Sequence, residues 1–435
     1  MNRKLILWSI TVALGGLLFG MDVANISGAE QRIQSLWNLS DWMHGTALAM
    51  ALYGTIFGAA FGSLPANRFG RKKTLIVIGI IFLVSAIGSA IAHDVYSFMA
   101  FRFLGGLSIG SSSVVAPVYI SEIAPPKHRG KMGIAFQLNV VTGILLAYLI
   151  NYLLQGFGGD NDWRYMLGTI AIPSLLFSVL MFFTPESPRW LILYKNDEAT
   201  ARKIFLLSGA NPDELIPEIK NSVHQKKERL FSGKFNKLLL LAFLIAFFNQ
   251  LSGINAIIYF APRVFELAGL AKKAAFLSSA GIGIVNFIFT IIGWYLIDRS
   301  GRKTLMYIGS AGYIISLTLM SLAFANVVHG GITIYVFVFI AAHAIGQGSV
   351  IWVFISEIFP NSVRAAGMSF GSLTHWTFAA LISQTFTFFA NHIGGAYIFG
   401  FFAFMMILQL LFVWRLMPET KGIALEDMDN AIVLH

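Results

Sequence analysis

The chain has 435 residues, of which 56% are hydrophobic and only 12% are charged, and its mean hydropathy is +0.71. A soluble domain carries about 25% charged residues, so this composition excludes a soluble globular protein and predicts an integral membrane protein. The formal net charge of +10 would fit nucleic-acid binding, but the positions of the basic residues, described below, explain this charge with no nucleic acid as a partner. The chain has no cysteine and therefore no disulfide framework.

Apolar segments recur along the whole chain. Each has about 20 residues or more, enough to cross a hydrocarbon core of about 30 Å as a helix. The first follows Arg3 and Lys4 and continues past Gly20 without a small-residue cleavage pattern, so we interpret it as a retained helix and not a signal peptide. The sequence predicts an all-α membrane protein with twelve transmembrane helices, at roughly residues 5–28, 44–64, 74–92, 96–120, 132–154, 164–183, 238–261, 275–296, 304–325, 331–355, 365–390 and 395–416.

One long polar stretch separates the first six apolar segments from the last six. We therefore predict an N-terminal six-helix half (residues 1–183), a cytoplasmic linker with short amphipathic helices (184–237) and a C-terminal six-helix half with a short cytoplasmic tail (238–435). Two such halves would form the duplicated architecture that is common among transporters.

Two short helices are expected in the linker, on the membrane surface. The run Asn196-Asp197-Glu198 is placed to cap a helix that extends through Leu207 and ends at Gly209. Pro212 and Pro217 are expected to bracket a turn before a second charged helix.

Lysine and arginine collect on one side of the predicted membrane. With the N-terminus in the cytoplasm, inner segments hold 25 of the 31 basic residues and outer loops hold 5, while Arg102 lies inside a segment. Because basic residues favour the cytoplasmic side, both termini are predicted to be cytoplasmic. The short outer loop after the seventh segment is expected to hold Arg263, Glu266, Lys272 and Lys273.

The two halves repeat three polar blocks in the same order. Residues 67–72 (Asn-Arg-Phe-Gly-Arg-Lys) return at 298–303 as Asp-Arg-Ser-Gly-Arg-Lys, at an offset of 231. The pair Glu122 and Arg129 returns as Glu357 and Arg364, and the block 185–187 returns at 418–420. Matched blocks at nearly one offset indicate a duplicated six-helix unit.

All of these blocks fall on the predicted cytoplasmic side. Arginine offers a planar fork that suits carboxylates, and the glutamates lie where such forks would reach. We expect a charge network that latches the two halves together when the protein opens outward; ordinary anchoring by basic residues is the alternative. The residues of this cytoplasmic gate are Arg68, Arg71, Glu122, Arg129, Arg299, Arg302, Glu357 and Arg364.

The seventh segment carries three amides, Asn249, Gln250 and Asn255, in a run that has no charged residue. An unpaired amide in hydrocarbon costs several kcal/mol, so these side chains must face other helices or a wet cavity. Ser252 and Gly253 are expected to loosen the helix so that Gln250 and Asn255 line one cavity. Such a cavity suits a neutral, hydroxyl-rich solute; helix–helix hydrogen bonding is the alternative.

The motifs resemble those of the sugar porters of the major facilitator superfamily, and the resemblance extends along the whole chain. It implies a membrane transporter that works as a monomer. The sequence has no clustered metal ligands, no nucleophile with a base and no phosphate-binding glycine loop outside the basic motifs, so we expect no enzyme activity, cofactor or metal. The motifs that carry the resemblance are Gly15–Asp22, the two Arg-x-Gly-Arg loops, Arg102–Gly106, Pro117–Glu122, Pro185–Trp190, Gln250–Asn255, Ser356–Pro360 and Pro418–Gly422.

The resemblance also implies a set of sugar contacts. Amides would pair with sugar hydroxyls, and indole rings would cover the apolar face of a pyranose. This chain departs from the family at Asn249, Phe260, His375 and Ala379, which leaves the sugar unidentified. The candidate substrate-binding residues are Phe19, Gln137, Asn249, Gln250, Asn255, Tyr259, Asn286, Gly348, Trp352, His375 and Trp376.

Asp22 and Arg102 are ionisable residues inside predicted membrane helices, where such groups are functional by default. Proton-coupled members of the family carry Asp at the position of Asp22, and passive facilitators carry Asn. We expect Asp22 to release its proton when Arg102 approaches, since a nearby cation favours the carboxylate. A permanent structural ion pair is the alternative, and His375 is a second candidate for the titrating group.

The expected function is proton-coupled symport of a monosaccharide, a hexose or a pentose, across the cytoplasmic (inner) membrane by alternating access. A passive facilitator with the same site is the nearest alternative. A transporter-like sugar sensor is a further one, which the short tails disfavour.

Overall fold

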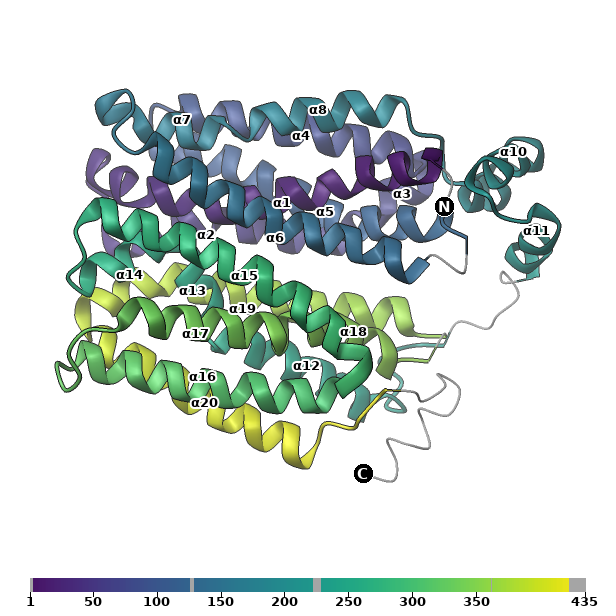
Figure 1. Ribbon diagram of the computed structural model, residues 1–435. Helices are drawn as coiled ribbons and strands as arrows, with labels where there is room; N and C mark the ends of the chain where they lie inside the picture. The colour runs from purple at the N-terminus through teal and green to yellow at the C-terminus, as the bar shows by residue number, and fades with distance from the viewer. Residues whose placement is uncertain (1–2, 126–128, 222–227, 361, 422–435) are drawn as a thin grey trace. The chain divides into compact units, whose positions relative to one another are not determined.

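The computed structural model describes residues 3–125, 129–221, 228–360 and 362–421, and the regular structure in those ranges is helical (Figure 1). Every one of the twelve predicted apolar segments is helical, so the predicted all-α class is correct. The elements are α1 (Arg3–Leu36), α2 (Asp41–Phe61), α3 (Ser63–Phe69), α4 (Arg71–Ile91), α5 (Val95–Ile123), α6 (Arg129–Leu154), the 3-10 turn η2 (Gly159–Asn161), α7 (Asp162–Gly168), α8 (Ala171–Phe182), α9 (Pro188–Trp190), the π-helical turn η3 (Leu191–Lys195), α10 (Glu198–Ser208), α11 (Pro212–Asn221), α12 (Asn236–Leu251), α13 (Ile254–Tyr259), α14 (Ala261–Leu267), α15 (Lys272–Ser300), α16 (Arg302–Phe324), α17 (Ile332–Ile345), α18 (Gln347–Ile358), α19 (Arg364–His392) and α20 (Gly395–Arg415).

Ten spans in the described part of the chain are long and apolar enough to cross a membrane, and the bent pair α2 and α3 adds an eleventh. Of the twelve predicted segments, only the one in α19 falls outside this count. At 29 residues α19 is long enough to cross, but polar side chains such as Thr374, His375 and Gln384 lower its mean hydropathy.

The chain forms two compact units, each with its own packed interior. The first contains residues 1–25, 50–147 and 156–226, and the second contains residues 26–49, 148–155 and 227–435. In the first unit α4 packs along α5 and α8, which run side by side with it in Figure 1. The division at residues 184 and 237 stays a prediction, because packing in one conformation need not follow the duplication.

In the second unit, the pairs α16 and α20, α16 and α17, and α12 and α19 pack against each other. Two of its membrane spans are broken at glycine. Gly253, at φ 83°, separates α12 from α13, and Gly346 separates α17 from α18. A Cβ on Gly346 would lie 2.8 Å from Gly309 Cα, so close backbone approach also requires glycine there.

The polar linker forms the short helices α10 and α11, which Figure 1 shows beyond the ends of the long helices of the first unit. Asp197 accepts a hydrogen bond from the Thr200 N–H, and Gly209 ends α10 in the left-handed conformation, as predicted. The turn expected between Pro212 and Pro217 is wrong, because both prolines lie within α11. Pro212 occupies the first helical position, where its missing N–H costs nothing.

The prediction of an outer loop after the seventh segment is also partly wrong. Arg263 and Glu266 belong to the short helix α14, and Lys272 and Lys273 begin α15. Phe265 and Val264 of α14 are buried, which explains why this polar stretch is helical instead of extended. The predicted tail beyond residue 421 lies outside the described residues.

Candidate functional site

The amides of the seventh segment meet at the break between α12 and α13. Asn255 Nδ2 donates to Gln250 Oε1 at 2.6 Å, and Gln250 Nε2 donates to Asn249 Oδ1 at 2.9 Å. Gly253 permits this meeting because its φ of 83° interrupts the helix, and a Cβ there would lie 2.4 Å from the Phe402 ring. The helix is therefore interrupted at Gly253, as expected, and the interruption lets the side chains of Gln250 and Asn255 form a hydrogen bond.

Aromatic rings from α18 and α19 gather next to these amides. Gln250 Nε2 lies 3.2 and 3.1 Å from the two ring nitrogens of His375. The His375 ring lies between two indoles, with its centroid 5.0 Å from that of Trp352 and 4.8 Å from that of Trp376. The second unit thus brings Asn249, Gln250, Asn255, His375 and the two tryptophans together.

The remaining candidates of the second unit lie on α13, α15 and α18. Tyr259 is fully buried on α13, and Asn286 is buried on α15. A Cβ on Gly348 would lie 3.1 Å from the carbonyl oxygen of His343, so α18 begins against the end of α17. Phe19 on α1 and Gln137 on α6, both half-buried, belong to the first unit.

Asp22 and Arg102 form an ion pair inside the first unit. Arg102 Nη1 donates to Asp22 Oδ1 at 2.6 Å, and the two side chains are 1% and 4% exposed, respectively. Asp22 Oδ2 and the Nε and Nη2 atoms of Arg102 are buried without a hydrogen-bond partner among the described residues. A pair held by a single hydrogen bond leaves polar atoms unsatisfied, which is costly in an apolar interior.

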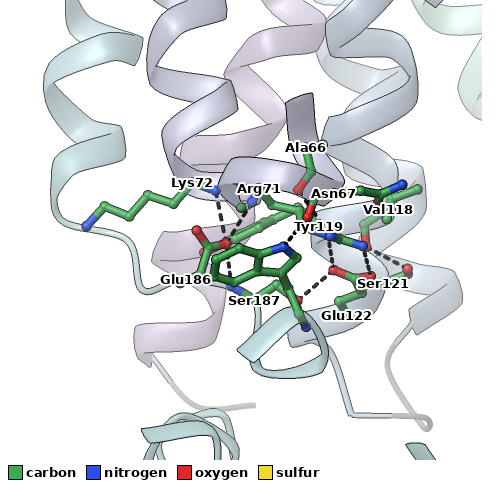
Figure 2. Close-up of polar contacts among 12 residues, drawn as sticks. Ala66, Asn67, Arg71, Lys72, Val118, Tyr119, Ser121, Glu122, Glu186 and Ser187 are labelled. Carbon is green, nitrogen blue, oxygen red and sulfur yellow. Dashed lines mark hydrogen bonds and ion pairs between the residues drawn. The ribbon is translucent and has the colours of Figure 1, made fainter. Parts of the chain in front are cut away.

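Arg71 and Glu122 form a two-bonded ion pair in the first unit, shown in Figure 2. Arg71 Nε and Nη2 donate to the two carboxylate oxygens of Glu122 at 2.9 and 3.0 Å. Glu186 Oε1 accepts the backbone N–H groups of Arg71 and Lys72, at 2.8 and 3.1 Å. Burial raises the pKa of Glu186 above its usual range, although backbone N–H groups bond to it.

The second unit builds the same arrangement from the repeated block. Arg302 Nε and Nη2 donate to Glu357 at 3.1 and 2.7 Å, and Glu419 accepts the backbone N–H groups of Arg302 and Lys303 at 3.0 and 2.9 Å. Thr420 Oγ1 donates to Glu357 at 2.6 Å, as Ser187 Oγ does to Glu122. The three repeated blocks are therefore parts of one cluster, built once in each unit.

Glycine is required at the same place in both clusters. Gly70 and Gly301 have φ of 98° and 85°, and a Cβ on them would lie 2.2 Å from Glu186 Oε2 and 2.6 Å from Glu419 Oε2. The loop backbone can therefore approach the carboxylate only without a side chain. Together these contacts explain why the Arg-x-Gly-Arg loops and the two glutamates recur as a set.

The other predicted gate residues are more peripheral. The Arg68 guanidinium lies over the Phe69 ring, and that of Arg299 lies over the Tyr295 ring. Arg364 Nε donates to the carbonyl of Phe359 at 3.2 Å. Arg129 begins α6, but its side chain lies outside the described part of the chain. Whether these residues latch the two halves stays a prediction.

The sequence analysis missed a buried cluster of charged residues in the second unit, around Glu30. Arg263 Nε and Nη2 donate to Glu30 at 2.9 and 2.7 Å, and the Glu30 side chain is fully buried. His44 Nε2 lies 3.2 Å from Glu30 Oε2, and its Nδ1 lies 3.3 Å from Thr387 Oγ1. Glu30 lies two residues beyond the first predicted segment, so a longer segment would have exposed it as an intramembrane acid.

Two buried glutamines, Gln347 and Gln409, were missed as well. Asn249 Nδ2 donates to Gln347 Oε1 at 3.3 Å, and Gln347 Nε2 donates to Gln409 Oε1 at 2.8 Å. Both glutamines lie in predicted apolar segments, so the reasoning applied to Asn249 and Gln250 would have found them. They extend the amide group of α12 into α18 and α20.

Comparisons with known proteins identify the family. Residues 8–432 match the sequence profile described as "Sugar (and other) transporter". The chain belongs to this sugar transporter family. It is 36% identical to the arabinose-proton symporter of Bacillus subtilis (strain 168), over 98% of this chain and 94% of the relative. It is 32% identical to the D-xylose-proton symporter of Escherichia coli (strain K12), over 97% of this chain and 95% of the relative.

Solved structures agree with the family. The inward-open conformation of the xylose transporter XylE from E. coli superposes with a TM-score of 0.87 at 31% identity, covering 98% of this chain and 99% of that one. XylE bound to 6-bromo-6-deoxy-D-glucose gives a TM-score of 0.83 at 31% identity, covering 99% of each chain. The sugar transporter described here is thus a multi-pass membrane protein with the twelve-helix major facilitator fold, and a transporter instead of an enzyme.

Proposed function

We propose that this sugar transporter moves a monosaccharide together with a proton across the cytoplasmic membrane by alternating access. Relatives along the whole chain are named as proton symporters of arabinose and of D-xylose. A third relative, 33% identical over 98% of this chain, is the glucose transporter GlcP of Staphylococcus epidermidis. The substrate is therefore a pentose or a hexose, and the proton is the coupling ion.

The ion pair of Asp22 and Arg102 carries the proposal. Both groups are buried, a single hydrogen bond of 2.6 Å joins them, and the second oxygen of Asp22 has no partner among the described residues. A structural pair would satisfy its remaining atoms, because each orphaned buried polar atom costs about 1–3 kcal/mol. A carboxylate held by one movable cation can take up a proton whenever that cation withdraws.

The proposed sugar contacts are the candidate residues that the family resemblance implies. In the second unit, Gln250 and Asn255 offer amides, and Trp352 and Trp376 offer ring faces beside His375. A sugar hydroxyl bonded to such an amide gains about 0.5–1.5 kcal/mol net, so several contacts are needed for useful affinity. Tyr259, Asn286 and Gly348, with Phe19 and Gln137 from the first unit, complete the proposed set.

The membrane placement follows from the basic residues. We place both termini in the cytoplasm of the source cell, with the inner membrane as the location, the lipid bilayer as the surrounding partner and a monomer as the working unit. On this placement the two arginine–glutamate clusters, each formed within one unit, lie on the cytoplasmic side, and we propose that they belong to the cytoplasmic gate.

Sugar accumulation in sealed vesicles tests the proposal. Wild type and Asp22→Asn are compared with and without a proton gradient, using D-xylose, L-arabinose and D-glucose. One charge moving across 100 mV is worth about 2.3 kcal/mol, which corresponds to roughly a fifty-fold concentration ratio at equilibrium. Wild type is expected to accumulate one of these sugars, and Asp22→Asn only to equilibrate or exchange it.

The opposite result separates symport from facilitation. If wild type brings sugar only to equal concentrations under a sound gradient, coupling is absent and the pair of Asp22 and Arg102 is structural. The protein is then a passive facilitator with the same binding site.

A further inference from the structure

A chain of five amides runs through the interior of the second unit. Asn255 Nδ2 donates to Gln250 Oε1 (2.6 Å), Gln250 Nε2 to Asn249 Oδ1 (2.9 Å), and Asn249 Nδ2 to Gln347 Oε1 (3.3 Å). Gln347 Nε2 then donates to Gln409 Oε1, and Gln409 Nε2 to Ser310 Oγ, both at 2.8 Å. The chain connects five helices: α13, α12, α18, α20 and α16.

Every bond in the chain points the same way. Each amide accepts through its oxygen and donates through its nitrogen to the next residue, from Asn255 toward Ser310. The two ends of an amide differ in hydrogen-bond role, so turning one member around would place oxygen against oxygen or nitrogen against nitrogen. The orientation of one amide is therefore coupled to the orientation of all the others.

Of the residues in this chain of amides, Asn255, at one end, is the most exposed to solvent. Gln347, Gln409 and Ser310 are fully buried, and Asn249 and Gln250 are 2% and 1% exposed, whereas Asn255 is 8% exposed. Because Asn255 uses Nδ2 to reach Gln250, its Oδ1 is the end that stays available. The open end of the chain thus offers a hydrogen-bond acceptor at the proposed sugar site.

We propose that Gln347 and Gln409 are positioning residues that fix the polarity of Asn255, so that Asn255 accepts a hydrogen bond from one sugar hydroxyl. This inference rests on the proposed sugar site. Neither residue is in the set of sugar contacts, and Gln409 acts on Asn255 only through the three amides between them. The selectivity that follows is for a hydroxyl that donates at this position, not for any oxygen that merely accepts.

Position 409 offers a matched pair of substitutions. Gln409→Met is close in shape but removes the acceptor for Gln347 Nε2. A buried N–H without a partner is rarer, and so costlier, than a carbonyl oxygen with a free lone pair, so we expect all four remaining amides to turn around. Asn255 would then present Nδ2 to the sugar. Gln409→Glu keeps an acceptor for Gln347 in either protonation state, so the original polarity should remain.

The affinities of deoxy and fluoro sugars show whether Asn255 accepts a hydrogen bond from the sugar or donates one to it. A deoxy sugar can neither donate nor accept at the altered carbon, whereas a fluoro sugar accepts weakly but does not donate. The probes are D-glucose, D-xylose and L-arabinose, followed by each monodeoxy and monofluoro derivative of the sugar that binds, titrated against purified full-length protein in lipid nanodiscs.

In wild type, we expect one hydroxyl at which the deoxy and fluoro derivatives lose affinity equally, by about three- to tenfold. In Gln409→Met, the fluoro derivative at that carbon should bind at least about threefold more tightly than the deoxy derivative. Gln409→Glu should behave as wild type does. A merely structural role would weaken all derivatives by the same factor and leave their ratio unchanged.

Gln347→Met provides a second variant if Gln409→Met does not fold. It removes the acceptor for Asn249 Nδ2, and the same reversal is expected of the three amides that remain between it and the sugar. The inference is wrong if the fluoro-to-deoxy ratio at every carbon is the same in wild type and in the folded variants. It is also wrong if none of the three parent sugars binds wild type, and that result alone overturns the proposed function as well.

Discussion

Arg102 Nη1 donates to Asp22 Oδ1 at 2.6 Å across 80 positions of the sequence, and both side chains are buried. The bond joins α5 to α1 within the first unit. Because a buried charge without its partner costs about 3–5 kcal/mol, separating the two side chains is costly while Asp22 is ionised. In a symporter, that penalty links the position of Arg102 to the protonation of Asp22.

Replacing Arg102 tests this link. In Arg102→Met the cation that faces Asp22 is gone, so we expect sugar exchange to continue while accumulation under a proton gradient is lost. Thermal unfolding gives an independent reading. Asp22→Asn alone leaves Arg102 buried and unpaired and should lower Tm, while the double variant Asp22→Asn/Arg102→Met should recover much of that loss. Additive effects of the two changes would contradict direct coupling.

The sequence predicted this pair because charged residues are rare in membrane helices and therefore conspicuous. The two arginine–glutamate clusters were predictable for another reason: the blocks that contain Arg71 and Arg302 recur with matching glycines and glutamates. Glu186 and Glu419 also recur, but their role in holding the loop backbone needed the structure, since it depends on carboxylate oxygens approaching the N–H groups of the loop.

Pairings between distant residues were beyond the sequence. Glu30 and Arg263 are 233 positions apart, and Gln347 and Gln409 are 62 apart, with no repeat that links either pair. The break at Gly346 was also missed, since a glycine inside an apolar run is as often a packing residue as a break. Pro217 was assigned to a turn, although the buried residues around it keep α11 helical.

The two arginine–glutamate clusters should differ in their contribution to stability. Glu122 is 7% exposed and Glu357 is 22% exposed, and Arg302 also lies 3.4 Å from the exposed Asp298, where the first unit has the neutral Asn67. We expect Glu122→Gln to destabilise by about 1–3 kcal/mol, because it weakens a charge-assisted pair that is nearly dry, and Glu357→Gln to destabilise less. Tm values of the two purified variants in one detergent decide the order, and each serves as the other's control. A larger loss for Glu357→Gln would show that burial does not set the ranking.

The cluster around Glu30 should behave as a buried ion pair. Glu30→Gln leaves Arg263 without its carboxylate, and we expect a loss of about 3–5 kcal/mol, seen as a large fall in Tm. The double variant Glu30→Gln/Arg263→Gln removes both charges and should be more stable than Glu30→Gln alone. Lys237, an exposed basic residue at the start of α12, offers a control, since Lys237→Gln removes one positive charge without touching Glu30. If the double variant is no more stable than Glu30→Gln, the charge pairing is not the source of the loss.

Gly106 marks a point of close helix approach that can be tested with one methyl group. A Cβ on Gly106 would lie 1.8 Å from the carbonyl oxygen of Ala51, so α5 and α2 could accept alanine there only by moving apart. Overpacking of this kind costs about 1–3 kcal/mol, and we expect Gly106→Ala to lower Tm accordingly. Gly168→Ala is the matched control, because its Cβ would meet only the Ala90 methyl at an ordinary 3.5 Å. An equal Tm for the two variants would mean that α5 and α2 can move apart to accept the methyl group without loss of stability.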